Sequence, residues 1–277
     1  MSNRNERPTV VLICHEDDRL DMEGLASWLA STLRLVGLIV IRDPRTRWRA
    51  ARRELKRVGW LRMLDVIAFR LYARLRLARR EATWATSELL RLRHRYPADL
   101  DTVPRVVVSS PNSDDARTFL ERLQPDLAIA RCKVILKPAI FDIPRVGTFV
   151  LHPGICPEYR NAHGCFWALA RRDLTRVGMT LLKVDAGIDT GPVFLHGTYD
   201  FNEVEDSHSV IQYRAVLENL DPIGNILTAM CRGDEVPRVS VEGRGSAVWG
   251  QPHLSAYLRW KWMARRRRNA SCVAAVS

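Results

Sequence analysis

The sequence predicts an open, mostly parallel α/β sheet, and three features support this fold class. Short apolar runs recur along the chain without the polar alternation typical of half-exposed strands. Segments with a helical period separate these runs, as in chains that build parallel sheets. Polar loops follow several runs directly, and in such sheets ligands bind beyond the carboxyl ends of the strands. At 277 residues, the chain is long enough for one large domain with an appendage.

The predicted elements alternate along the chain. The first apolar run, residues 9–14 (TVVLIC), precedes the polar loop HEDDR. Further strands are expected at residues 37–41, 105–108, 126–130 and 147–151, and another apolar run covers 177–184. Helical patterns are expected at about residues 22–33, 113–123 and 162–171. The main domain is therefore expected at residues 1–235, with a short basic, Trp-containing C-terminal extension at 236–277.

Positive charge is concentrated in two places. Residues 42–95 hold 17 Arg or Lys against 5 Asp or Glu, a surplus equal to the +12 of the whole chain. Six more basic residues stand near the C-terminus: Arg259, Lys261, Arg265, Arg266, Arg267 and Arg268. The remainder is mildly acidic, so nucleic acid is not the expected partner.

A helical insertion is expected at about residues 47–95 within the basic region. Its apolar side chains fall on one helical stripe, made of Trp60, Leu64, Ile67, Leu71, Leu75 and Ala78. One interpretation is a helix packed on the domain, with its arginines in water. The other is a segment that covers the active site or makes a peripheral contact with an anionic membrane. Aromatic side chains beside the cations suit the membrane interpretation: Trp48, Trp60, Trp260 and Trp262.

Composition indicates a folded cytoplasmic protein. The chain is 47% hydrophobic and 27% charged, which excludes a disordered protein. No apolar run approaches the length that spans a bilayer, and the first residues lack the core of a signal peptide. The six cysteines form no CxxC pair, so reduced thiols are expected. His152, Cys156, His163 and Cys165 match no familiar ligand spacing, so no metal is expected.

The most informative segment is the polar loop HPGICPEYRNAHG at residues 152–164, which follows the fifth predicted strand. A histidine at a strand end can accept or relay a proton because its pKa lies near neutrality, and its charged form stabilises an oxyanion. A carboxylate beside the histidine would fix its tautomer, as in other acyl-transfer sites. DAGIDTGP, at residues 185–192, carries carboxylates on a turn-prone loop.

The segments VLHPGICPEYRN and VDAGIDTGP together resemble the family of formyltransferases that use 10-formyltetrahydrofolate. This family includes methionyl-tRNA, glycinamide ribonucleotide and sugar N-formyltransferases, and its sheet is Rossmann-like. His152 and Asp189 stand 37 positions apart, close to the family spacing. The upstream stretch QPDLAIARCKVILKPAIFDIPRVGT is similar to the family's lead-in to its catalytic strand.

The resemblance implies roles for particular residues. His152 and Asp189 would form the catalytic pair. The cofactor 10-formyltetrahydrofolate would lie against the loops at residues 131–136 and 185–189, and its contacts are assigned to Arg131, Cys132, Lys133, Val134, Ile135, Leu136, Asp185, Ala186, Gly187 and Ile188. Contacts with the amine acceptor are assigned to His15, Glu16, Tyr159, Arg160 and His163. For the loop at residues 15–19, a plain surface loop is the alternative.

One position departs from the family pattern. The family has a catalytic asparagine two positions before the histidine, where this chain has Val150. Loss of an oxyanion-hole donor typically costs about 10² to 10³ in rate. Asn161, where the family usually has glycine, is the candidate for a substitute catalytic donor, and Lys133 and backbone amides are alternatives.

The resemblance implies transfer of a formyl group to a primary amine of a small acceptor. Methionyl-tRNA members carry an additional C-terminal barrel, for which the 45 residues after Arg232 are too few. The purine enzyme has a glycine-rich phosphate loop after its first strand, which HEDDR does not match. By elimination, the expected acceptor is an amino sugar or its nucleotide- or lipid-linked derivative. A folate- or substrate-binding relic without turnover, and a formyltetrahydrofolate hydrolase, are the alternatives.

Overall fold

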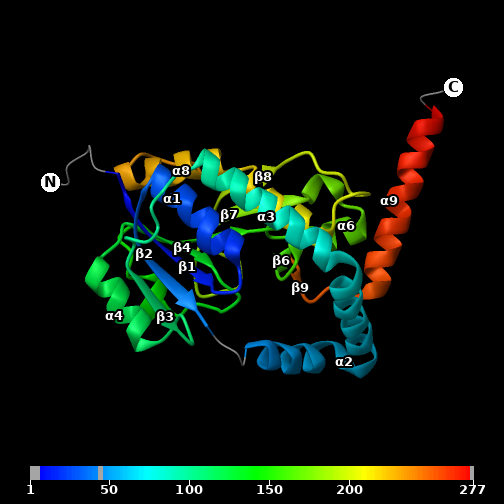
Figure 1. Ribbon diagram of the computed structural model, residues 1–277, viewed down its shortest axis with the longest axis horizontal. Coiled ribbons are helices and arrows are strands. Elements are labelled where there is room, and N and C mark those ends of the chain that lie inside the picture. Colours follow the sequence, from blue (N-terminus) through cyan, green and yellow to red (C-terminus); the bar gives the residue numbers. More distant parts are fainter. Residues whose placement is uncertain (1–6, 43–45, 275–277) are drawn as a thin grey trace.

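The fold is built on a seven-stranded sheet with the strand order β3-β2-β1-β4-β5-β7-β8. The computed structural model in Figure 1 describes residues 7–42 and 46–274. The strands are β1 (Thr9–His15), β2 (Arg34–Ile41), β3 (Arg105–Val108), β4 (Leu127–Arg131), β5 (Gly147–His152), β7 (Gly178–Lys183) and β8 (Val193–Thr198). The first five pair in parallel, and β7 and β8 continue the sheet antiparallel. This confirms the expected open, mostly parallel α/β sheet.

The central strand β1 shows why its sequence is a continuous apolar run. Val10 through Cys14 are all fully buried. Val10, Leu12 and Cys14 pack in one apolar cluster, and Val11 and Ile13 pack in the other. Because successive side chains point to opposite faces of a sheet, a strand covered on both faces needs apolar residues at every position.

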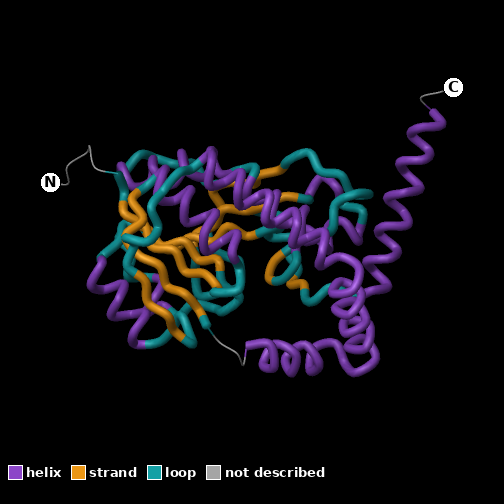
Figure 2. The backbone as a smooth tube through the Cα atoms, viewed as in Figure 1, coloured by secondary structure: helices purple, strands orange, loops and turns teal. Residues whose placement is uncertain are grey.

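Helices cover both faces of the sheet, as Figure 2 shows. Apolar side chains of α4 (Asp114–Leu123) and α5 (Pro138–Phe141) fill the cluster on one face. The other face is covered by the π-helical turn Leu20–Leu25, α1 (Ala26–Thr32), α3 (Ala78–Arg95), α6 (Gly164–Arg171), α7 (His208–Leu217) and α8 (Leu220–Arg232). A short 3-10 turn, Leu174–Arg176, leads from α6 into β7.

The insertion is helical, as expected, but its long stripe does not pack on the domain. α2 (Thr46–Tyr72) is kinked at Gly59, whose φ of 76° lies in the left-handed region, and it continues through the π-helical turn Ala73–Leu77 into α3. The narrow face that carries Val66 and Phe69 is buried, whereas Trp60 and Leu75 are 68% and 71% exposed. The helix thus packs on the domain with its arginines exposed, as in the first interpretation, but through a face other than the stripe.

The C-terminal segment runs along the domain. β9 (Val248–Trp249) pairs in parallel with β6 (Arg160–Asn161), and α9 (Leu254–Ala274) packs beside α2 at one end of the molecule. Trp260 is 1% exposed, so the expected interfacial role of this tryptophan is wrong. The side chain of Trp48 lies outside the described residues. In the described part of the chain, no helix is both long enough and apolar enough to cross a membrane.

Candidate active site

His152 is the last residue of β5, and partners face both of its ring nitrogens. Its side chain is buried, and Nε2 lies 2.7 Å from the carbonyl oxygen of Tyr159. Because a carbonyl only accepts hydrogen bonds, Nε2 must carry a hydrogen. Nδ1 lies 3.6 Å from Oδ2 of Asp189. The His152–Asp189 pair expected from the motif spacing is therefore assembled.

The charge state of His152 follows from these partners. Burial disfavours the charged ring, but the Asp189 carboxylate outweighs it, and the pKa of His152 is raised to about 10. A neutral ring with hydrogen on Nε2 would turn the lone pair of Nδ1 toward a carboxylate. A second hydrogen on Nδ1 removes this repulsion. The resting form at neutral pH is therefore an imidazolium paired with a carboxylate.

Asp189 is positioned by Asn161. The backbone N–H of Asn161 donates to Oδ2 of Asp189 at 2.7 Å, while its side-chain amide donates to the carbonyl oxygen of Trp249 in β9. Asn161 has φ of 73°, in the left-handed region where Gly and Asn are the favoured residues. The asparagine thus suits both the backbone conformation and the β6–β9 pairing. Its side-chain amide is directed to β9 and away from the role of substitute oxyanion donor.

Val150 offers no polar group at the position of the family asparagine. Its side chain is partly buried and packs against apolar clusters that include Ala130 on β4 and Leu182 on β7. It lies two residues before His152 on the same strand, so both side chains point to the same face of the sheet. An oxyanion at this face would need a donor from elsewhere.

The loop after β5 is held by residues that the sequence analysis did not single out. Thr180 lies opposite His152 in the β5–β7 register. Its hydroxyl donates to the carbonyl of Gly154 at 2.7 Å and accepts from the N–H of Cys156 at 3.0 Å. Nε2 of His196 donates to the carbonyl of Cys156 at 2.8 Å. The only signal for Thr180 was a hydroxyl inside an apolar run.

The second motif folds back on itself. The Asp185 carboxylate accepts from the N–H of Gly187 at 3.0 Å and from the hydroxyl of Thr190 at 2.8 Å. A Cβ on Gly191 would stand 1.9 Å from the carbonyl oxygen of Lys183, so only glycine fits there. Asp185 therefore shapes the loop through the N–H of Gly187 and the hydroxyl of Thr190.

The expected cofactor segments divide into buried and exposed side chains. Arg131 donates to Asp21 at 3.0 Å and to the carbonyl of Leu151 at 2.6 Å, so its guanidinium ties β4 to β5. Leu136 is buried in the core. These two side chains are structural, which differs from the expected cofactor contact. Ile135 and Ile188, in contrast, are 57% and 37% exposed. Lys133 is also exposed, and Cys132, Val134 and Ala186 are the remaining residues of these loops.

Two of the expected acceptor residues have structural partners. The Tyr159 side chain is buried, and its hydroxyl donates to Asp173 at 2.9 Å. Glu16 is paired with Arg42, whose Nε donates to it at 2.6 Å. Both contacts differ from the expected role in acceptor binding.

The other three expected acceptor residues connect the loops around the site. Nε2 of His15 accepts from the N–H of Lys133 at 3.0 Å, which links the ends of β1 and β4. Arg160 donates to the carbonyl of Ile188 at 3.2 Å. Burial, followed by the charges of Lys133 and Arg70, lowers the pKa of His163 to about 4, so this ring is neutral.

Partly buried His163 and buried His208 form an imidazole pair with unused hydrogen-bonding capacity. Their ring centroids lie 6.1 Å apart. Within the described residues, Nδ1 of each ring and Oε1 of Gln212 are buried without a hydrogen-bond partner. Buried polar atoms are rarely left unpaired, so these atoms suggest a polar ligand nearby.

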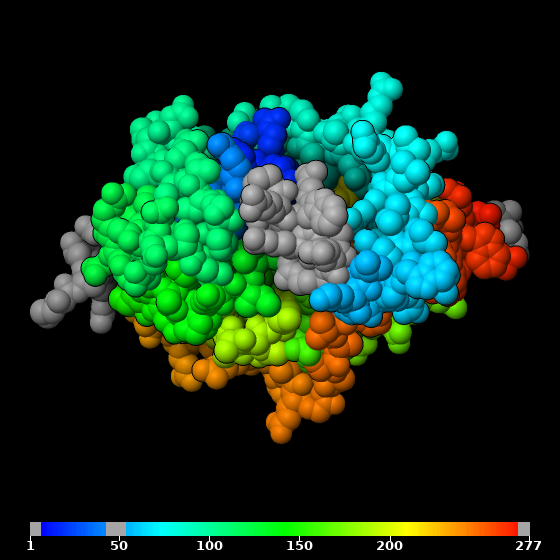
Figure 3. Space-filling view, turned by 90° about the horizontal axis from the view of Figure 1, so that it is seen from below, coloured from blue at the N-terminus to red at the C-terminus, as the bar shows by residue number. Residues whose placement is uncertain are grey.

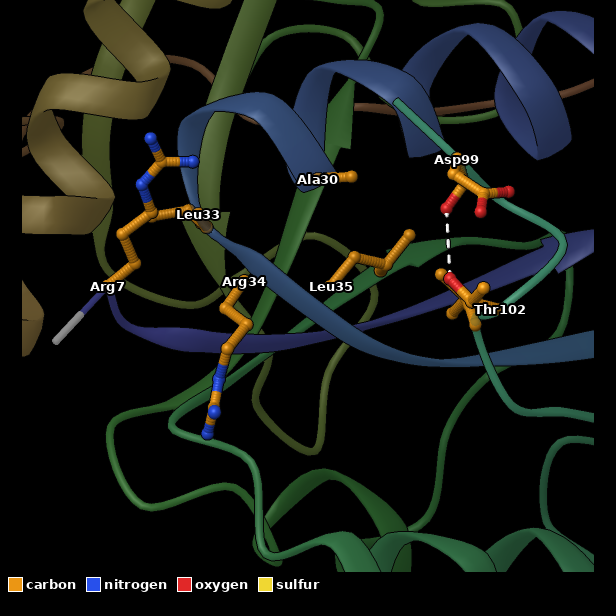
Figure 4. Close-up of a pocket in the computed structure, with 8 residues that line it drawn as sticks. Arg7, Ala30, Leu33, Arg34, Leu35, Asp99 and Thr102 are labelled. Carbon is orange, nitrogen blue, oxygen red and sulfur yellow. Dashed lines mark hydrogen bonds between the residues drawn. The ribbon is translucent and has the colours of Figure 1, made fainter. Parts of the chain in front are cut away.

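No metal-binding cluster of His, Cys, Asp or Glu occurs among the residues that the structure describes. A pocket drawn in Figure 4 lies far from His152, at the amino ends of β1 to β3. Its lining includes Arg7, Arg34, Leu35, Asp99 and Thr102. It therefore belongs to the opposite edge of the sheet from the site described here.

Comparison with known proteins finds similarity to one family. Residues 95–219 match the model of the formyl transferase family. The chain is 38% identical over 81 residues to the methionyl-tRNA formyltransferase of Dehalococcoides mccartyi (strain CBDB1), across 29% of this chain and 26% of that protein. The chain thus spans about a quarter of the length of this curated relative.

Solved structures share the fold at low sequence identity. The phosphoribosylglycinamide formyltransferase of Anaplasma phagocytophilum superposes with a TM-score of 0.53 and 14% identity, across 89% of this chain and 100% of that one. A sugar N-formyltransferase from Shewanella sp FDAARGOS_354 has a TM-score of 0.52 and 12% identity, across 91% and 87% of the two chains. These similarities show the same α/β fold.

Proposed function

We propose that this protein transfers a formyl group from 10-formyltetrahydrofolate to a primary amine of an amino sugar or its nucleotide- or lipid-linked derivative. The observation that carries the proposal is the pairing of buried His152, at the end of β5, with partly buried Asp189. Both residues lie inside the segment that matches the model of the formyl transferase family. Charge pairs of this kind occur where acyl transfer needs a stabilised oxyanion.

The residues present fit the folate donor. Ile135 and Ile188 are apolar side chains left exposed on the two loops assigned to the cofactor, and a flat ring system would cover such side chains. Asp185 holds the N–H of Gly187 and Arg160 holds the carbonyl of Ile188, so the other peptide groups of residues 186–188 are the ones that suit the donor–acceptor edge of a pterin. When bound, 10-formyltetrahydrofolate supplies the formyl carbon that the amine attacks.

The chain's own residues have distinct tasks in this proposal. The His152 imidazolium stabilises negative charge on the formyl oxygen. Asp189 keeps His152 protonated, and its carboxylate is the base assigned to the proton that the amine loses, because His152 is already charged. Asn161 orients Asp189 through its backbone N–H. Lys133 and the backbone amides of the loops are the donors left to compensate for Val150.

The acceptor class is supported by the imidazole pair. The unpaired atoms of His163, His208 and Gln212 are uncharged hydrogen-bonding groups. Such groups suit sugar hydroxyls, which both donate and accept. One solved structure with the same fold is described as a sugar N-formyltransferase, which agrees with this acceptor class.

The test uses purified protein with 10-formyltetrahydrofolate and a panel of free and nucleotide-linked amino sugars. Acceptor-dependent consumption of the cofactor is the expected result. His152→Gln should lower turnover by at least about 10²-fold. His94→Gln, on the exposed side of α3, is the matched control and should leave it unchanged. Consumption without acceptor would indicate a hydrolase, and folate binding without consumption would indicate a relic, the alternative that Val150 favours.

A further inference from the structure

An apolar stripe on α2 faces outward, opposite the side that packs on the domain. We define the α2 stripe as Trp60, Leu64, Ile67, Leu71 and Leu75, each of which is at least 50% exposed. At 100° per residue, these positions gather on one side of the helix, and the buried Val66 and Phe69 lie on the other. The α2 stripe is therefore an apolar surface that the described part of the chain leaves uncovered.

The exposed charged side chains between residues 60 and 80 are all positive. Six arginines are exposed between residues 60 and 80, namely Arg62, Arg70, Arg74, Arg76, Arg79 and Arg80. None of the six forms an ion pair with another described residue. The two acids of residues 60–87 are turned inward: Asp65 accepts from Ser255 of α9, and Glu81 accepts from Ser207. At 100° per residue, Arg74 and Arg79 stand beside the stripe, whereas Arg62, Arg76 and Arg80 lie on the opposite side. The outer surface of the segment therefore carries the apolar stripe with Arg74 and Arg79 at its flanks.

The neighbouring helix α9 has the same combination. Leu258 and Trp262 are 47% and 54% exposed, and the Arg266 guanidinium lies 3.9 Å from the centre of the Trp262 ring. Figure 3 shows the α2 region in light blue beside α9 in orange and red, at one end of the molecule. The two helices together therefore present apolar side chains among arginines.

We infer that the α2 stripe and its arginines form a docking surface for an anionic phospholipid bilayer. An apolar face flanked by cations matches the boundary between charged head groups and acyl chains. A second copy of the chain would fit worse, because stripe-to-stripe contact would bring two sets of unpaired arginines together. The stripe would enter the interface without spanning the bilayer.

The test is flotation of the full-length protein with phosphatidylcholine vesicles that contain or lack phosphatidylglycerol. Binding is expected only with phosphatidylglycerol, and it should weaken as salt rises, because screening weakens the arginine contacts. The triple variant Leu64→Gln, Ile67→Gln and Leu71→Gln should bind at least about tenfold more weakly. Leu90→Gln is the matched control, because Leu90 is 61% exposed on α3, outside the stripe.

A second variant separates charge from apolar contact. Arg74→Glu with Arg79→Glu should also weaken binding, and it leaves the apolar side chains in place. Equal binding to both kinds of vesicle, no binding at low salt, or unchanged binding of both variants would overturn the inference. So would a dimer in sedimentation that the triple glutamine variant dissociates, since the stripe would then be an interface between copies. The formyl transfer assay without vesicles is independent of these outcomes.

Discussion

Replacing Asp189 by asparagine should lower the pKa of His152 without changing the shape of the site. The attraction across 3.6 Å, with an effective dielectric constant of about 20, is roughly 4.6 kcal/mol, equivalent to about 3 pKa units. This is comparable to the shift that brings the pKa of His152 to about 10. In Asp189→Asn the largest raising contribution is lost, while burial still lowers the pKa and the contacts with Cys156 and the Tyr159 carbonyl still raise it, so the pKa of His152 should fall well below about 10.

The same pair makes the stability of the fold depend on pH. Because the folded pKa is raised above the unfolded value, the pair stabilises the protein fully below about pH 6.5, and this stabilisation disappears as pH rises through about 10. The loss is at most about 5 kcal/mol of unfolding free energy. Asp189→Asn should lack this decline.

The assay is a titration of histidine ring resonances by NMR, together with urea unfolding between pH 6 and pH 10. His152→Gln is the control, because it removes the titrating ring and reports the pH dependence of all other groups. Turnover of Asp189→Asn should fall by at least about 10²-fold. A wild-type His152 that titrates near pH 6.5, or a pKa that does not move in Asp189→Asn, would refute the charge-pair reasoning.

Three further predictions concern residues around the site. Asn161→Gly should keep turnover within about threefold of the wild-type value, because it retains the left-handed backbone and the N–H that donates to Asp189. Val150→Asn should raise turnover by about tenfold or more, because it restores a hydrogen-bond donor. A 10²-fold loss in Asn161→Gly would instead assign the substitute donor to the side-chain amide. Gly191→Ala should lower the unfolding free energy by about 1–3 kcal/mol, since its Cβ would meet the Lys183 carbonyl. Gly245→Ala is the control, because no atom lies within 4 Å of the added Cβ, and it should leave the unfolding free energy in urea unchanged.

The sequence alone predicted the sheet, the similarity to formyl transferases and the pairing of His152 with Asp189. Runs such as residues 9–14 are apolar at every position, which only a strand buried on both faces requires. The two motifs around His152 and Asp189 lie at chain positions that the fold brings together. These features are local, so a pattern in the chain is enough to detect them.

The tertiary structure decided which side of each element meets a partner. The α2 stripe has the period of a buried face, yet Val66 and Phe69 are buried instead, because α9 contributes Tyr257 against Phe69 on that side. An apolar pattern predicts that a helix face can be buried, but it does not predict which element will cover that face.

The tertiary structure also decided the partners of polar side chains. Asn161 binds the Trp249 carbonyl, 88 positions away, and Arg131 binds Asp21, 110 positions away. The sequence marked both as candidates for a ligand, and long-range contacts gave them structural partners. Pairings across such separations depend on how the elements pack, because hydrogen bonds and ion pairs act only over a few ångströms.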